Sequence, residues 1–228
     1  MAQDTQVSIV ALRTLPMFEA LAEDRLAAIV KVASLRRIER QTVVLHAGDR
    51  TDNLYLVLSG SLKVLIEGDD GREVILSMLG PGEFFGEMGI IDDHPRSATV
   101  KTTEPSNLVV ISKADFQRCL ADNFDVSLFI MRSLVKRLRQ ADRKIESLSL
   151  MDVYGRAARL LLELAEERDG RKVVTRKITR QDIARMIGAS REMVSRVMRD
   201  LQSGGLIDER DGCIWLCGEA DGSQAGPV

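Results

Sequence analysis

The stretch TRQDIARMIGASREMVSRVMRDLQSGGLI, residues 179–207, decides the fold of the C-terminal part of the chain. Apolar residues recur at helical spacing over two segments, 180–188 and 190–203. Gly188 stands between these segments, and glycine readily takes the left-handed conformation that ends a helix. The pattern predicts two short helices joined by a tight turn, which is a helix-turn-helix.

The charges of this stretch favour a nucleic-acid partner. Residues 176–199 carry seven arginines and lysines against Asp182 and Glu192, a net charge of +5. The alternative, an αα-hairpin in a protein-binding domain, leaves that charge unexplained. Arginine forks pair with guanine, a carboxylate accepts from cytosine, and cap hydroxyls and outlying arginines hold phosphates. The residues predicted to contact DNA are Thr179, Arg180, Ser190, Arg191, Glu192, Ser195, Arg196 and Arg199.

The segments that flank the helix-turn-helix complete a small domain. Residues 206–216 (LIDERDGCIWL) predict a hairpin that turns at Asp211-Gly212 and serves as a wing. Upstream, residues 153–168 predict a helix and residues 173–178 a strand. The Gly/Ser/Pro-containing tail after Gly218 is typical of disorder.

A long helical pattern precedes this domain. Ser127, Met131, Leu134, Leu138, Ala141, Ile145 and Leu148 repeat with a mean spacing of 3.5 residues, and charged residues lie off this stripe. Such a seam predicts a partner helix, and therefore a homodimer. The alternative is a helix packed on its own sheet. Asp152 breaks the pattern and is the predicted hinge.

The N-terminal part has a different texture. Residues 16–33 predict an amphipathic helix that opens at Pro16. From about 38 to 112, short β-rich runs are separated by Gly or Asp turns, which is typical of an antiparallel barrel or sandwich. The chain is therefore expected to belong to the α+β class. The expected strands cover residues 42–45, 54–58, 61–66, 73–79, 97–103 and 107–112.

A second motif, GPGEFFGEMGIIDDHPRSATV at residues 80–100, predicts a ligand pocket. Gly86 allows a close backbone approach, a short helical turn follows Glu87, and Arg96 and Ser97 begin the next strand. An arginine, a hydroxyl and a helix N-terminus are suited to one phosphate, and an ionised carboxylate accepts from a ribose 2′-hydroxyl. The alternative is a loop in which Glu87 and Arg96 simply pair.

Three separated motifs together resemble the cyclic-AMP receptor protein / fumarate–nitrate regulator superfamily of bacterial transcription factors. They are GEMG…PRSA (86–98), the hinge before DVYGR (152–156) and TRQDIA…GASREMVSRV (179–197). The resemblance implies an antiparallel β-roll that binds cyclic nucleotides, a long dimerisation helix and a winged helix-turn-helix. The expected divisions are residues 1–123, 124–151 and 152–218, with a tail at 219–228.

By position, the resemblance assigns ligand contacts to the β-roll and base readers to the second helix of the helix-turn-helix. Arg191, Glu192 and Arg196 match the base-reading residues of the cyclic-AMP receptor protein, which implies a palindrome of TGTGA-like half-sites, and RNA polymerase is an expected partner. The ligand residues are Gly86, Glu87, Met88, Arg96, Ser97 and Ala98, with Ala141 and Asp142 from the long helix.

The long helix departs from the family pattern at the two positions that contact the purine base of the ligand in relatives. Cyclic-AMP-binding relatives commonly have a Thr/Ser or Thr/Asn pair where this chain has Ala141 and Asp142. Asp142 could accept from a guanine, and some relatives respond to cyclic di-GMP. The retained Arg96-Ser97 pair favours a 3′,5′-cyclic mononucleotide, cyclic AMP or cyclic GMP. A regulator of this family that needs no ligand is the remaining alternative.

Composition excludes other classes. The 228 residues have 45% hydrophobic and 29% charged content and a net charge of −2, which is typical of a globular protein that is not a basic coat protein. No run reaches the roughly 18 apolar residues of a membrane span, and the absence of a signal predicts a cytoplasmic location. Three cysteines and two histidines show no metal-ligand spacing, so no metal, iron–sulfur cluster or haem is expected. No catalytic constellation is present; the rival class is a nucleotide-sensing regulatory subunit that acts on protein partners.

Overall fold

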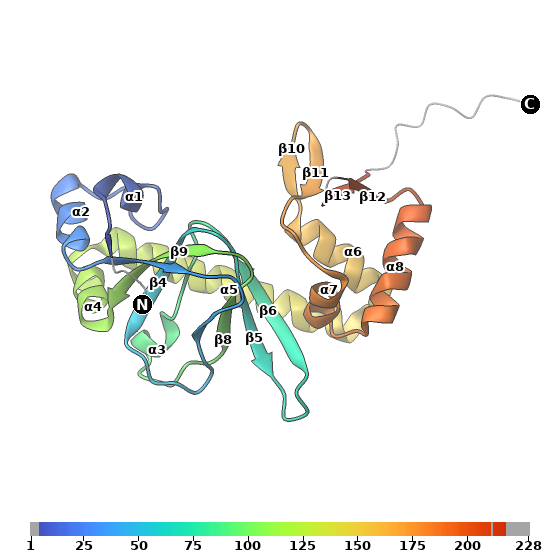
Figure 1. Ribbon diagram of the computed structural model, residues 1–228, viewed down its shortest axis with the longest axis horizontal. Coiled ribbons are helices and arrows are strands. Elements are labelled where there is room, and N and C mark those ends of the chain that lie inside the picture. Colours follow the sequence, from blue (N-terminus) through green and yellow to red (C-terminus); the bar gives the residue numbers. More distant parts are fainter. Residues whose placement is uncertain (1–4, 211, 218–228) are drawn as a thin grey trace, which may run out of the picture. The chain divides into compact units, whose positions relative to one another are not determined.

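The computed structural model describes residues 5–210 and 212–217 and divides the chain into two compact units, residues 1–139 and 140–228. Both units combine helices with antiparallel strands, which confirms the α+β class (Figure 1). Each unit is described by itself.

The first unit is a β-roll of two antiparallel sheets. One sheet has the strand order β1-β2-β9-β4-β7 and the other β3-β8-β5-β6. Successive side chains of β4 and β9 point to opposite faces of the first sheet, and both faces are apolar, so one face packs against the helices and the other against the second sheet. The strands are β1 Thr5–Gln6, β2 Ser34–Ile38, β3 Val43–Leu45, β4 Asn53–Ser59, β5 Leu62–Glu67, β6 Glu73–Leu79, β7 Phe84–Phe85, β8 Thr99–Thr102 and β9 Ser106–Ser112.

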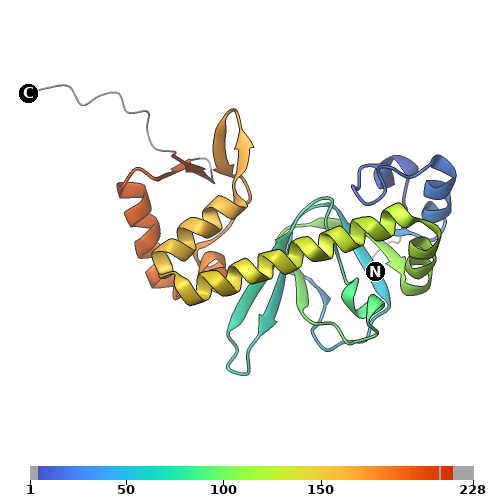
Figure 2. The ribbon, with the colours of Figure 1, turned by 180° about the vertical axis from the view of Figure 1, so that it is seen from behind.

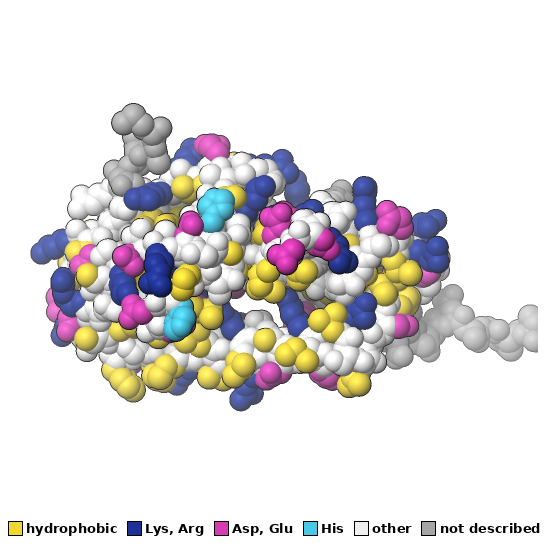
Figure 3. Space-filling view, turned by 90° about the horizontal axis from the view of Figure 1, so that it is seen from below, with side chains coloured by type: hydrophobic (Ala, Val, Ile, Leu, Met, Phe, Trp, Pro, Cys, Tyr) yellow, Lys and Arg dark blue, Asp and Glu magenta, His cyan; other side chains and the backbone are white. Residues whose placement is uncertain are grey.

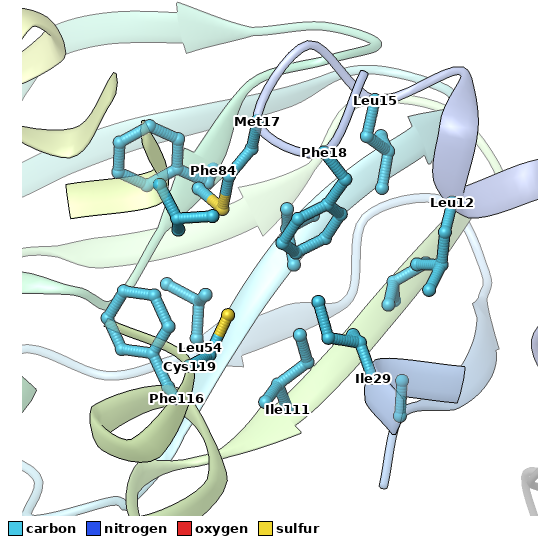
Figure 4. Packing of buried hydrophobic residues seen from close by; sticks show 14 of the residues in the cluster. Leu12, Leu15, Met17, Phe18, Ile29, Leu54, Phe84, Ile111, Phe116 and Cys119 are labelled. Carbon is cyan, nitrogen blue, oxygen red and sulfur yellow. The ribbon is translucent and has the colours of Figure 1, made fainter. Parts of the chain in front are cut away.

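The helix predicted over residues 16–33 is wrong in its first half. Helix α2 covers only Glu23–Val30, a separate helix α1 covers Ile9–Arg13, and turns lie between them. Tertiary packing overrides the helical pattern, because Leu15, Met17 and Phe18 turn into the core (Figure 4). Figure 4 shows Met17 beside Phe84 of β7 and Leu15 beside Phe18; all of them belong to one buried cluster with Leu54 of β4 and with Phe116 and Cys119 of helix α4, Lys113–Asp122.

The long helix α5 covers Phe124–Leu150 and follows α4 after Asn123. Its first turns cross the β-roll and bury Val126 and Ile130 in the core (Figure 2). Several predicted seam residues stay exposed, with Met131 at 49%, Leu138 at 63% and Ile145 at 64%. Leu134, in contrast, packs against the core of the β-roll.

The second unit contains the predicted helix-turn-helix. Asp152 caps helix α6 Val153–Leu164, which confirms the break between the two long helical segments. Helix α6 ends earlier than predicted, because residues Glu166–Arg168 form strand β10. The wing hairpin is confirmed, although Asp211 lies outside the described residues, as does the tail from 218. The remaining elements are β11 Arg171–Val174, α7 Arg180–Ile187, α8 Arg191–Ser203, β12 Ile207–Arg210 and β13 Cys213–Leu216.

The wing is part of a larger sheet than the sequence indicated. Its two strands join the hairpin of β10 and β11 in the order β10-β11-β13-β12. Trp215, the single tryptophan of the chain, lies in β13 and pairs with Val173 and Asp208. It therefore provides a spectroscopic probe within this unit.

Over residues 5–210 and 212–217, no helix is both long and apolar enough to cross a membrane. Within the same ranges, no cluster of three or more His, Cys, Asp or Glu side chains could hold a metal ion. Both histidines lie at the surface and are coloured cyan in Figure 3. Cys119 is buried and Cys217 is exposed.

Candidate functional site

The turn after β7 builds the centre of the predicted ligand pocket. Gly86 has φ +88°, and a Cβ atom there would lie 2.9 Å from the Asn53 carbonyl oxygen. Glycine is therefore required both for the left-handed conformation and for the close approach to the neighbouring strand β4, which begins at Asn53. Glu87 follows and directly precedes the short helix α3, Met88–Ile91, which confirms the predicted helical turn; the Glu87 side chain makes no capping hydrogen bond. The turn directs the Glu87 side chain inward, where only 2% of it is exposed.

Glu87 pairs with an arginine that the sequence analysis did not assign to the pocket. Nη1 of Arg137, on α5, donates to Oε1 of Glu87 at 2.6 Å. The Arg137 guanidinium also lies 4.7 Å from the centre of the Phe84 ring and donates to the Phe84 carbonyl. Burial raises the pKa of the Glu87 carboxyl above its usual range, and the charge of Arg137 opposes that rise.

Arg96 is buried beneath the same turn, with 5% of the residue exposed. Its Nε donates to the Thr51 hydroxyl at 2.8 Å, and its Nη2 donates to the carbonyls of Thr51 and Asn53 at 2.6 and 2.7 Å. Nη1 donates to the Gly86 carbonyl. Burial lowers the pKa of Arg96. Glu87 and Arg96 thus share the turn, but the alternative in which they pair only with each other is wrong.

The other predicted ligand residues differ in exposure. Ser97 is exposed, and its hydroxyl lies 3.9 Å from the sulfur of Met88, which is itself 50% exposed. Ala98 is buried immediately before strand β8. Ala141 and Asp142 are exposed and belong to the second unit.

The helix-turn-helix forms from local capping interactions. Thr179 and Asp182 make a reciprocal capping box at the start of α7, and Gly188 ends that helix at φ +64°. The Ser190 hydroxyl accepts from the Met193 amide at 3.1 Å and so begins α8. The apolar side of α8 is buried against α6 and α7, as predicted, and consists of Val194, Val197, Met198 and Leu201.

The opposite face of α8 presents its charges to solvent. Arg191, Glu192, Arg196 and Arg199 are exposed. A hydrogen bond from its own backbone amide and one from Ser190 lower the pKa of Glu192, so its carboxylate stays an acceptor at neutral pH. Besides Thr179 and Ser190, other predicted DNA contacts are also engaged within the unit, and Nε of Arg199 donates to the Ser195 carbonyl at 3.3 Å. The Ser195 hydroxyl donates to the Arg191 carbonyl at 2.8 Å, and Arg180 forms an ion pair with Glu209 of the wing.

Both halves of the chain match known families. The family model described as the cyclic nucleotide-binding domain matches residues 35–123, and the Crp-like helix-turn-helix domain matches residues 155–219. The cAMP-activated global transcriptional regulator Vfr of Pseudomonas aeruginosa is 37% identical over 182 residues, which cover 75% of this chain and 84% of Vfr. The CRP-like cAMP-activated global transcriptional regulator of Mycobacterium tuberculosis is 32% identical over 195 residues, which cover 84% of this chain and 87% of the relative.

A solved structure supports the same grouping. The c-di-GMP responsive global regulator CLP of Xanthomonas campestris is 33% identical and aligns with a TM-score of 0.72, covering 86% of this chain and all of that chain. These matches confirm the resemblance drawn from the three motifs. The chain belongs to the cyclic-AMP receptor protein / fumarate–nitrate regulator family of DNA-binding transcription regulators.

Proposed function

We propose that this protein is a homodimeric transcription regulator whose DNA affinity is set by a cyclic nucleotide, most directly cyclic AMP or cyclic GMP. One observation carries the proposal. A buried carboxylate, Glu87, and a buried guanidinium, Arg96, share one glycine turn in a domain that matches the cyclic nucleotide-binding family. That pairing of an acceptor with a cation suits a sugar phosphate.

The residues present are compatible with such a ligand. The ionised Glu87 accepts a hydrogen bond from the ribose 2′-hydroxyl, while Arg96 and the exposed Ser97 hydroxyl meet the phosphate. Gly86, Met88 and Ala98 supply the surrounding surface. Because Arg137 already donates to Glu87 at 2.6 Å, the sugar shares or displaces that contact. Ligand binding therefore acts on α5, the helix that carries Arg137.

The identity of the base depends on the long helix. Ala141 and Asp142 stand where relatives commonly carry hydroxyl or amide side chains, and Asp142 suits the N1–H and N2–H₂ donors of guanine. Cyclic di-GMP is therefore a second candidate effector. It is favoured by the similarity to CLP, which responds to c-di-GMP, at 33% identity.

Calorimetry with cyclic AMP, cyclic GMP and cyclic di-GMP tests the effector. We expect one ligand to bind with a stoichiometry of one per chain and to change the affinity for a TGTGA palindrome in a gel-shift titration. Glu87→Gln should weaken the binding of that ligand. The matched control is Glu83→Gln, which alters a carboxylate that accepts from the Gly80 amide and should leave ligand binding unchanged. DNA affinity that is unchanged across all three ligands would indicate the ligand-independent alternative.

The exposed face of α8 is the proposed DNA-reading surface. Arg191 and Arg196 read guanine, and Glu192 reads cytosine. The remaining residues contact phosphates or stabilise the helices that carry the readers; they are Thr179, Arg180, Ser190, Ser195 and Arg199. Arg191→Ala should cost about 1–3 kcal/mol of discrimination at a single base pair. Arg199→Ala is the control, because loss of a phosphate contact weakens all sequences alike. Uniform weakening by Arg191→Ala would show that Arg191 is a phosphate contact.

The apolar face of α5 is the proposed dimer seam. Its members are Met131, Leu134, Leu138, Ala141, Ile145 and Leu148, and Leu148 is 55% exposed. Each large side chain that a partner helix covers contributes up to about 1.5–3 kcal/mol. Leu138→Glu should yield a monomer in sedimentation experiments, whereas Gln140→Glu, which adds the same charge nearby, should not. A dimer that survives Leu138→Glu would place the interface elsewhere.

In the proposed mechanism, the effector changes the seam, and rotation at Asp152 spaces two recognition helices about one DNA turn, ~34 Å, apart. The proposal also includes the division of the chain into residues 1–123, 124–151 and 152–218. We further propose a location in the cytoplasm and an interaction with RNA polymerase. The rival, a regulatory subunit for protein partners, predicts no operator binding by residues 151–218.

A further inference from the structure

The guanidinium of Arg96 is almost fully engaged within the protein. An arginine side chain carries five N–H donors in a fixed planar fork. Four of these donors are directed to Thr51 Oγ1, the Thr51 and Asn53 carbonyls and the Gly86 carbonyl. One N–H, on Nη1, has no partner among the residues that the structure describes. The fork is therefore not free to bind a phosphate with two parallel hydrogen bonds.

Thr51 accepts two of these four hydrogen bonds. One goes to its hydroxyl, which is the only side-chain acceptor among the four, and the other goes to its carbonyl. Its hydroxyl accepts from Nε at 2.8 Å, and its carbonyl accepts from Nη2 at 2.6 Å. Contacts on both edges of the fork prevent the planar group from rotating. The Nη1 end then lies against the glycine turn, 3.0 Å and 3.7 Å from where Cβ atoms of Gly86 and Gly89 would stand. Thr51 thus determines which single donor faces the site.

The charges around Arg96 restrict the ligand further. The carboxylates of Glu87 and Asp52 both act on the Arg96 charge. Each also repels a phosphate, and the repulsion scales with the charge of the ligand. A phosphomonoester carries about −1.5 to −2 at neutral pH, whereas a phosphodiester carries a single negative charge. A site that has one free N–H and two nearby carboxylates favours the phosphodiester.

We propose that Thr51 is a positioning residue that holds the Arg96 fork so that only one N–H meets the ligand, and that the site thereby selects a phosphodiester over a phosphomonoester. The inference deepens the proposed effector function and rests on it. It concerns the charge class of the ligand and applies equally to cyclic mononucleotides and to cyclic di-GMP.

The first test examines, without any ligand, whether the Thr51 hydroxyl holds the Arg96 guanidinium in place. In wild-type protein, the Arg96 Nε–H should give a slowly exchanging ¹⁵N–¹H resonance, since it is buried and hydrogen-bonded. Thr51→Val keeps the shape but removes the hydroxyl, so this resonance should shift and exchange faster. Thr51→Ser should restore it. Thr103→Val, which removes a hydroxyl bonded to the Ser61 carbonyl in the same unit, should leave it unchanged. An unchanged resonance in Thr51→Val overturns the proposal.

The second test measures selectivity. Dissociation constants for cyclic AMP, cyclic GMP and cyclic di-GMP are compared with those for 5′-AMP and 5′-GMP. In Thr51→Val, we expect the affinity for the bound phosphodiester to fall about tenfold, as for loss of a charged hydrogen bond. The monoester affinity should fall less or rise, because the released fork can offer two donors. The preference for the diester therefore falls, and Thr51→Ser restores it.

The outcomes separate the two proposals. If wild-type protein binds none of the three phosphodiesters, the effector function and this inference both fail. If it binds one of them, and Thr51→Val keeps the same ratio of diester to monoester affinity, only the role of Thr51 fails. Equal losses for both ligand classes, together with a lower melting temperature, would identify Thr51 as a structural residue and would also overturn the inference.

Discussion

Replacing Arg137 with methionine should destabilise the first unit in a pH-dependent way. The change removes the partner of Glu87, whose side chain is 2% exposed, but keeps an apolar group over Phe84. Breaking a fully buried ion pair costs about 3–5 kcal/mol and an exposed one about 0–1 kcal/mol. Since the Arg137 side chain is 35% exposed, we expect an intermediate loss of about 2–3 kcal/mol at pH 8.

The pH dependence follows from the direction of the Glu87 pKa. Burial already raises the pKa of this carboxyl, and Arg137 opposes the rise, so removal of Arg137 raises it further. A raised pKa in the folded state means that folded protein binds a proton that unfolded protein has released, and stability then grows as the pH falls. The loss of unfolding free energy caused by Arg137→Met therefore has its full size at pH values above the Glu87 pKa of the variant. As the pH falls from that pKa toward the lower Glu87 pKa of the wild type, the loss becomes smaller.

Urea unfolding followed by circular dichroism at pH 5 to 8 measures this effect. Trp215 fluorescence reports the second unit separately and should not change. Adding Glu87→Gln to Arg137→Met should recover part of the loss, because the unpaired buried charge is gone. Arg139→Met, at an exposed arginine two residues further along, is the control. An equal cost of Arg137→Met at every pH, or strict additivity in the double variant, would refute the reasoning.

Three further predictions concern capping and thiol reactivity. Gly188→Ala should cost about 1 kcal/mol or more, because φ +64° is strained for alanine; the thermal transition of Trp215 fluorescence measures it, and no shift would contradict it. Ser190→Ala should destabilise the same unit by about 1 kcal/mol through loss of the α8 cap, while Ser190→Asp should keep most of that stability. Burial raises the pKa of Cys119 to about 11, so iodoacetamide at pH 8 should modify Cys217 well before Cys119; mass spectrometry of peptides checks the order, and equal rates would contradict it.

The helix-turn-helix could be predicted from sequence because its determinants are local. The caps at Thr179 and Ser190 and the left-handed Gly188 act within a few residues of the helices they begin or end. The apolar side of α8 follows directly from its period. The wing hairpin could be predicted for the same reason, whereas its extension by β10 could not, because β10 consists of the exposed residues 166–168.

The N-terminal segment shows where periodicity fails. Residues 16–22 have the composition of an amphipathic helix, yet the adjacent residues Met17 and Phe18 are both almost fully buried. A helix would place these neighbours about 100° apart, whereas the core contacts both. Strand β2 was missed because two adjacent arginines, Arg36 and Arg37, interrupt its alternation. In both regions, packing against segments that are distant in the sequence determines the secondary structure.

The candidate site shows the same division. Glu87 and Arg96 could be proposed as site residues from one motif because they flank the short helix α3 within the segment 80–100. The roles of Thr51 and Arg137 depend on contacts across 45 and 50 residues of sequence, and no spacing rule contains that information. Arg137 precedes Ala141, which only the resemblance assigns to the ligand, by about one turn of α5.

The pair of Arg137 and Glu87 suggests how occupancy of the proposed site acts on α5. A ribose hydroxyl that donates to Glu87 uses an oxygen atom of the carboxylate that Arg137 now contacts. Any conformation of α5 that withdraws Arg137 leaves Glu87 free for the sugar, and a bound sugar in turn stabilises that conformation. Reciprocal linkage then requires that operator DNA strengthen effector binding by the same factor by which the effector strengthens DNA binding. Calorimetric titration of the effector with and without operator should give that factor, and Arg137→Met should reduce it toward one.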